Sequence, residues 1–77
     1  MTPEQAIQMI KDEHDRAIAR YAPFHSAHEG YAVLLEEVRE LEHEVFLKPS
    51  DRSSNMTREA AHIGAMAIRF LSDCCTE

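Results

Sequence analysis

The sequence has few cysteines and no long apolar run. Its two cysteines, Cys74 and Cys75, are adjacent, so no second pair exists to bridge a loop, and neighbouring cysteines are typical of free thiols in a reducing compartment. No apolar run approaches the roughly 20 residues that span a bilayer, and the N-terminus lacks the basic-then-apolar pattern of a signal peptide. We therefore expect a cytoplasmic protein with no membrane partner and no disulfide framework.

Basic residues are also scarce. Eight lysines and arginines stand against 14 acidic residues, which gives a net charge of −6. Non-specific nucleic-acid binding depends on the neutralisation of phosphates by lysine and arginine, so this balance argues against a nucleic-acid partner. It remains compatible with a nucleotide ligand, because a bound metal ion inverts the local field.

The chain is long enough for one small domain, residues 1–77. A domain this short buries a modest part of its surface, so its own core provides only marginal stability. Association between copies is then the expected source of further buried area. The sequence predicts a homo-oligomer, either a homodimer or a homotetramer.

The first helix is expected from Pro3 to about Tyr21. Thr2 and Gln5 have the spacing of a capping box, and Pro3 suits the first helical position. Pro23 disfavours helical geometry at the residue before it, which predicts the end of the helix. The apolar residues recur at helical spacing, with His14 on the same stripe: Ile7, Ile10, Ala17, Ile18 and Tyr21.

Two further helices are expected on either side of a polar linker, residues 48–55. Ser26 and Glu29 form a second capping-box pattern, which predicts a helix from about Ala27 to residue 46 or 47. Gly30 is unfavourable within this helix and indicates close approach by another backbone or by a ligand, with an ordinary packing contact as the alternative. The third helix is expected over residues 56–74, with an apolar stripe of Ile63, Ala67, Phe70, Leu71 and Cys74. With no strand pattern, the predicted class is all-α: three helices, the last two forming an antiparallel hairpin, assembled into an oligomeric helix bundle.

An acidic cluster is predicted where the second and third helices face each other. Glu37 and Glu40 are three residues apart, so they lie on one face of a helix, beside Glu36. Glu59 and His62 have the same spacing on the next helix. A divalent cation would relieve the repulsion among these carboxylates. The alternative is an acidic helix face exposed to solvent, which is the commoner situation.

These residues also carry a family resemblance. Residues 24–41 (FHSAHEGYAVLLEEVREL) and 58–70 (REAAHIGAMAIRF) resemble the MazG-like all-α nucleoside triphosphate pyrophosphatases, above all the short, phage-type members. The resemblance runs over about residues 21–73. The family signature is ExxE followed, after a loop, by ExxD. Glu37 and Glu40 match its first half and Glu59 begins its second, whereas His62 stands where the family has aspartate.

The resemblance implies a metal-dependent hydrolase that cleaves a (d)NTP to a (d)NMP and pyrophosphate. It implies Mg²⁺ as cofactor, with Mn²⁺ as an alternative, held by Glu37, Glu40, Glu59 and His62. Glu36 is the expected outer acceptor or base, so the expected catalytic residues are Glu36, Glu37, Glu40 and Glu59. An imidazole at position 62 is a softer ligand than a carboxylate and favours Mn²⁺, Co²⁺ or Zn²⁺ over Mg²⁺.

The expected substrate contacts flank the start of the second helix. Phe24, His25 and His28 are candidates for a base pocket, although Phe24 could instead be a hydrophobic staple at the helix entry. For the phosphates, the candidates are Arg58, Arg69, Lys48 and Arg52, and a salt bridge explains Arg58 equally well.

Two other functions remain open from the sequence. A relative that binds nucleotide or metal without catalysis would result if His62 disables the site. A structural helical interaction module would have the same helices with a solvated acidic face. Stabilisation by Mg²⁺ or Mn²⁺ separates the second alternative from the other two, because only a true site is stabilised by occupancy.

Overall fold

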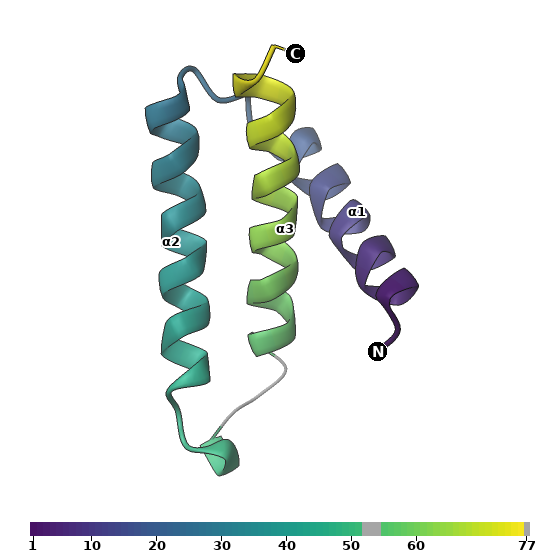
Figure 1. Cartoon of the computed structure of the whole chain (residues 1–77), viewed down its shortest axis with the longest axis vertical. Coiled ribbons are helices and arrows are strands. Elements are labelled where there is room, and N and C mark those ends of the chain that lie inside the picture. The colour runs from purple at the N-terminus through teal and green to yellow at the C-terminus, as the bar shows by residue number, and fades with distance from the viewer. Residues whose placement is uncertain (52–54, 77) are drawn as a thin grey trace.

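The computed structural model describes residues 1–51 and 55–76, and it confirms the predicted all-α class. The chain forms α1 (Pro3–Arg20), α2 (Ala27–Val45) and α3 (Asn55–Cys74), with a short 3-10 turn, η1 (Pro49–Asp51), after α2 (Figure 1). No strand occurs in these two stretches of the chain. None of the described helices combines the length and apolar character needed to cross a membrane.

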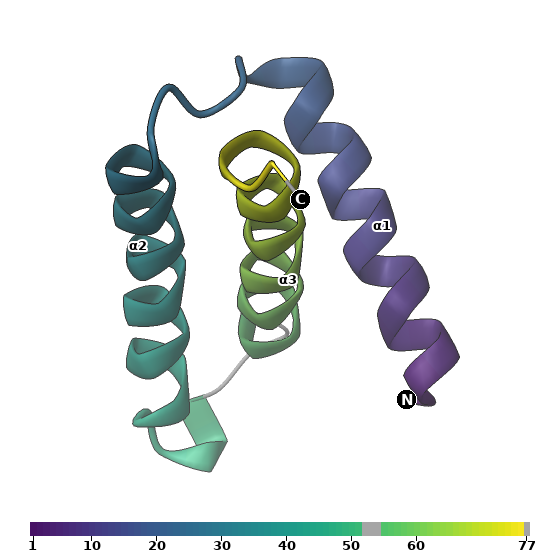
Figure 2. The same ribbon diagram turned by 45° about the horizontal axis from the view of Figure 1, so that its top comes forward.

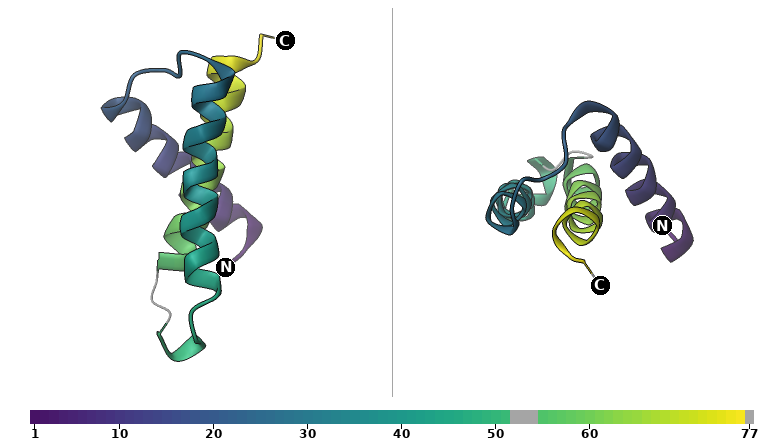
Figure 3. Two further views of the ribbon diagram at one scale, coloured as in Figure 1. Left: turned by 90° about the vertical axis from the view of Figure 1, so that its left-hand side faces the viewer. Right: turned by 90° about the horizontal axis from the view of Figure 1, so that it is seen from above.

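The helix α3 is the centre of the fold, because it packs against both other helices. The helices α2 and α3 run antiparallel, which confirms the predicted hairpin, and α1 lies on the other side of α3 (Figure 2). Seen from above, α1 crosses α3 obliquely instead of running parallel to it (Figure 3). The segment between α1 and α2 therefore passes over one end of α3 (Figures 2 and 3).

The helix ends are set by local capping with one departure from expectation. Thr2 Oγ1 accepts from the Gln5 amide at 3.1 Å, and Gln5 Oε1 accepts from the Thr2 amide at 2.8 Å, so the first capping box is confirmed. Ser26 caps α2 by accepting from the Glu29 amide. The Glu29 carboxylate, however, accepts from the His25 amide, so the second capping box is incomplete.

Parts of the predicted apolar stripes are wrong. On α1, Ile7, Ile18 and Tyr21 are all more than half exposed, while Ala17 is buried. The reason is that α1 packs on one helix only, so a narrow strip of it is covered. On α3, Leu71 is exposed as well. This helix packs against both α1 and α2, and its buried residues are Glu59, Ala61, Ala65, Met66 and Arg69.

Both glycines allow close packing of side chains. A Cβ on Gly30 would lie 2.9 Å from a ring carbon of Phe70 and 3.0 Å from one of Phe24. The neighbours of Gly30 are thus side chains of this chain, which is the packing alternative and not the approach of a backbone or a ligand. Gly64 of α3 lies against the Ile10 side chain of α1. The structure of one chain does not show whether copies associate, so the homodimer or homotetramer stays a prediction.

Gly64→Ala is expected to destabilise the fold and loosen α1. The new Cβ would lie 2.6 Å from Ile10 Cδ1 and 2.8 Å from Ile10 Cγ1, so either the Ile10 side chain or one of the two helices must shift. Overpacking costs about 1–3 kcal/mol, which exceeds the gain of roughly 0.5–1 kcal/mol for alanine in a helix. Urea denaturation measures the loss, with the exposed Ser72→Ala as a control that should change little. An unchanged midpoint for Gly64→Ala would contradict this packing of α1.

Candidate metal centre and adjoining cleft

Three of the predicted ligands meet between α2 and α3. Each of Glu37, Glu59 and His62 offers a ligand atom, and these three atoms lie within 4.8 Å of one another. Glu59 and His62 are three residues apart, which places them on adjacent turns of α3. The antiparallel packing of the hairpin then brings the middle of α2, with Glu37, opposite them. This is the arrangement that the spacing of the acidic residues predicts.

One oxygen of each carboxylate in this cluster, Oε2, lacks a hydrogen-bond donor in the described part of the chain. The Oε2 atoms of Glu37 and Glu59 are buried, and neither accepts a hydrogen bond from the described part of the chain. His62 Nδ1 lies 3.4 Å from Glu37 Oε2 and 3.8 Å from Glu59 Oε2. Glu59 as a whole is only 8% exposed. Buried acceptors without donors are unfavourable, and a divalent cation with oxygen and imidazole ligands would satisfy them. The residues present therefore fit a metal ion.

The cluster holds its carboxylates in an environment that disfavours their charge. Burial raises the pKa of Glu37 to about 7, and the charge of Glu40 adds to this shift. Burial also raises the pKa of Glu59, with a further contribution from hydrogen bonding to Glu40. Glu40 itself is exposed and lies outside the group of three ligand atoms. Its carboxyl group forms hydrogen bonds with Glu37 and Glu59 and thus borders the cluster, and its role as a direct ligand stays a prediction.

A fourth acidic residue, Glu13, reaches the cluster from α1. Its Oε2 lies 3.0 Å from His62 Nε2, and its Oε1 accepts a hydrogen bond from Arg16. That hydrogen bond, opposed by partial burial, lowers the pKa of Glu13. Sequence reasoning missed this residue. The available signal was its place between Ile10 and Ala17 on the strip of α1 that faces α3, where a charge needs a partner.

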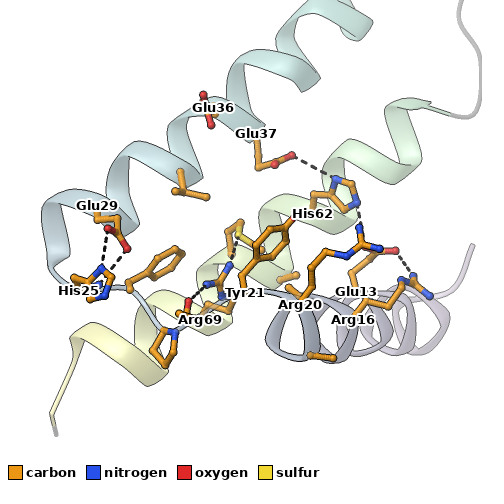
Figure 4. Close-up of a pocket in the computed structure, with 18 residues that line it drawn as sticks. Glu13, Arg16, Arg20, Tyr21, His25, Glu29, Glu36, Glu37, His62 and Arg69 are labelled. Carbon is orange, nitrogen blue, oxygen red and sulfur yellow. Dashed lines mark hydrogen bonds and ion pairs between the residues drawn. The ribbon is translucent and has the colours of Figure 1, made fainter.

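An open cleft of about 1080 Å³ joins this cluster to a group of cations (Figure 4). One part of its wall carries Glu36, Glu37, His62 and Glu13. The other part comes from the end of α1, the following loop and α3, and includes Arg16, Arg20, Tyr21, Phe24, His25 and Arg69. Acidic ligands and basic side chains on one cleft are suited to a ligand that carries both a metal ion and phosphates.

Arg69 is the most deeply placed cation of this cleft. It is 5% exposed, donates to the Ala22 carbonyl at 3.0 Å, and its guanidinium lies 4.2 Å from the centre of the Phe24 ring. No carboxylate among residues 1–51 and 55–76 forms an ion pair with it. A buried guanidinium without an acidic partner is suited to an anionic ligand.

The predicted substrate residues are spread over different surroundings. Phe24 is buried in the core with Ala17 and Met66 but still borders the cleft. His25 is exposed at the cleft and contacts Glu29. Three other candidates are exposed and lie outside the cleft lining: His28, Arg58 and Lys48. Arg58 donates a hydrogen bond to Asn55 Oδ1 at 2.7 Å. Arg52 lies outside the described residues. Sequence reasoning missed Arg16, Arg20 and Tyr21, since it assigned no site residue to the first helix.

No protein-family model matches this chain, and no significant match was found among curated proteins or solved structures. The resemblance to the MazG-like pyrophosphatases therefore rests on the motifs in the sequence.

Proposed function

We propose that this protein is a metal-dependent nucleoside triphosphate pyrophosphohydrolase of the MazG-like kind, which releases pyrophosphate and a (d)NMP. The observation that carries the proposal is the pair of buried carboxylate oxygens, on Glu37 and Glu59, that accept no hydrogen bond in the described chain. Glu37 borders a cleft that also holds arginines, as a site for a metal–triphosphate requires. The ExxE spacing and the second half-motif at Glu59 support the same conclusion.

The cation would be held by Glu37, Glu59 and His62, with Glu40 at the edge of the site. A bound Mg²⁺ or Mn²⁺ supplies a Lewis acid for phosphate oxygens and lowers the pKa of a coordinated water molecule. The carboxylate of Glu36 is exposed on the same cleft wall, where it can accept a proton from water.

Phosphate binding is assigned to the arginines of the cleft. Arg69 forms no ion pair with a carboxylate of the described residues, and Arg16 and Arg20 line the same opening from α1. Phe24, Tyr21 and His25 would border the base and the sugar at the far part of the cleft. The proposal includes a homodimer or homotetramer, supported by the large apolar side chains that one chain leaves exposed, such as Ile7, Ile18 and Tyr31.

A second candidate is a protein that binds metal and nucleotide without hydrolysing it. The specific observation in its favour is His62, which stands at the place of the family's aspartate. Its Nε2 lies 3.0 Å from Glu13 Oε2. Loss of one negative ligand weakens the attraction for a hard dication.

The experiment is a measurement of pyrophosphate release from a panel of NTPs and dNTPs with Mg²⁺ or Mn²⁺. We expect release from at least one substrate, faster with Mn²⁺ than with Mg²⁺, because imidazole suits the softer ion. His62→Asp is expected to shift the Mn²⁺/Mg²⁺ rate ratio toward Mg²⁺. If the protein binds Mn²⁺ and nucleotide but releases no pyrophosphate, the second candidate is correct. If it binds neither, both are wrong and a structural helical module remains.

A further inference from the structure

His62 is held by side chains from all three helices. Its Nε2 lies 3.0 Å from Glu13 Oε2 of α1, while its Nδ1 faces Glu37 of α2 at 3.4 Å and Glu59 of α3 at 3.8 Å. Figure 4 shows the imidazole bridging the carboxylates of Glu37 and Glu13. The two ring nitrogens thus have different surroundings, one a single carboxylate and the other two carboxylates that lack donors.

The contact with Glu13 defines which nitrogen carries the proton in the neutral ring. Arg16 donates a hydrogen bond to the other oxygen of Glu13 and favours its ionised form. An ionised carboxylate only accepts hydrogen bonds, so His62 Nε2 must be the donor. The lone pair of the neutral ring is then on Nδ1, which is the nitrogen directed at Glu37 and Glu59. A lone pair facing two carboxylates is stable only with a cation or a proton between them.

We propose that His62 binds the divalent metal directly through Nδ1, and that Glu13 of α1 is the positioning residue that fixes this orientation from outside the metal's ligand shell. The inference rests on the metal centre proposed above and adds a ligand atom, a positioning residue and a third helix to it. A carboxylate that holds the second nitrogen of a metal-binding histidine orients the ring and increases its basicity. The first helix, which carries neither half of the acidic motif, is therefore part of the site.

The ligand set that results has consequences for the choice of metal. Two carboxylates and one imidazole nitrogen suit Mn²⁺, Co²⁺ or Zn²⁺, whereas Mg²⁺ prefers oxygen ligands alone. The alternative is that a proton takes the place of the metal. His62 would then be a charged imidazolium that forms a structural network with Glu13, Glu37 and Glu59. In that case His62 would donate no nitrogen to a bound ion.

The test combines Mn²⁺ affinity with a direct measurement of nitrogen coordination. Calorimetry gives the Mn²⁺ affinity of wild type, Glu13→Ala and Glu13→Gln. Pulsed electron paramagnetic resonance of the Mn²⁺-loaded proteins, with and without ¹⁵N-labelled histidine, detects a coordinated imidazole. We expect histidine coupling in wild type and none in His62→Asn. Glu13→Ala should bind Mn²⁺ about 10–100-fold more weakly. Glu13→Gln, whose amide oxygen can still accept a hydrogen bond from His62 Nε2, should lose less of its affinity for Mn²⁺.

The matched control is Asp15→Asn, which removes the same charge from an exposed position of α1, two residues from Glu13. It should bind Mn²⁺ within about twofold of wild type. If wild type binds Mn²⁺ without histidine coupling, or if both Glu13 variants bind it as tightly as wild type, the inference is wrong and the proposed function stands. If wild type binds no Mn²⁺, both are wrong. Should Glu13→Ala fail to fold, the isosteric Glu13→Gln decides, by a loss of affinity beyond that of the control.

Discussion

Glu59→Gln is expected to lose nearly all stabilisation by Mn²⁺ and to be at least about 100-fold less active in pyrophosphate release. The substitution keeps the size of the side chain but removes the charge of a proposed ligand that is buried, at 8% exposed. Loss of an outer residue alone costs about 10–100-fold in metal affinity, and loss of a direct ligand should cost more. The unfolding free energy of wild type should increase by about 2.7 kcal/mol at a metal concentration 100 times its Kd, and that of the variant should hardly change.

The same variant should be at least as stable as wild type when a chelator is present. Burial raises the pKa of Glu59, which means that the folded protein holds this charge at a cost that glutamine avoids. Thermal unfolding with EDTA and with Mn²⁺ measures both effects. Glu42→Gln is the control, because Glu42 is an exposed residue of α2 with the same charge. Equal Mn²⁺ binding by Glu59→Gln and wild type would remove Glu59 from the site.

Without metal, the protein is expected to lose stability as the pH rises from about 4.5 to 7, and Glu37 is a main cause. Its carboxyl titrates near 7 in the folded chain, against an ordinary value of 4.5. Between these two values the folded state holds a proton that the unfolded state has released. The unfolding free energy therefore decreases with rising pH, and the contribution is complete below 4.5 and gone above 7.

Glu37→Gln should remove this contribution. Its unfolding free energy should match that of wild type at pH 4.5 and exceed it at pH 8 by up to about 3 kcal/mol, the value of a shift from 4.5 to about 7. Glu59 shifts in the same direction but is present in both proteins, and Glu13 and Glu29, whose pKa values are lowered, change below this window. Urea denaturation in EDTA across this pH range measures the difference. Parallel pH profiles for the two proteins would contradict a raised pKa at Glu37.

Metal binding should show the opposite dependence on pH. A cation must displace the proton that Glu37 holds below about 7, so the stabilisation by Mn²⁺ should grow as the pH approaches that value. The same measurements with saturating Mn²⁺ therefore test the assignment of Glu37 as a ligand. A solvated acidic face would show only the weak response expected from ionic screening.

The sequence predicted the elements of this fold where the signals are local. The Thr2–Gln5 capping box and Pro23 define α1 to within one residue, because caps and proline act over a single turn. The cap at Ser26 was also predicted, but the reciprocal bond of the capping box did not form, because the Glu29 carboxylate accepts from the His25 amide instead. The apolar stripes were less accurate, because apolar spacing does not reveal how many neighbours a helix has.

The candidate site was likewise predicted only where local spacing determines it. The three-residue spacing determined that Glu59 and His62 share a face of α3, and the hairpin placed Glu37 opposite them. The pairing of Glu13 with His62 needs the oblique docking of α1 on α3, which depends on Gly64 lying under Ile10. Arg69 likewise reaches the Ala22 carbonyl and the Phe24 ring across more than 40 residues of chain.

By itself, then, the sequence determined the helices and the ligands within two adjacent ones, because helical geometry relates residues only over neighbouring turns. Only the tertiary structure decided that Glu13 of α1 contacts His62 and that the buried Arg69 lies in the same cleft as His62 and Glu37. Those relations arise from the angle and distance at which helices pack, and these depend on side-chain volumes at the contacts instead of on spacing along the chain.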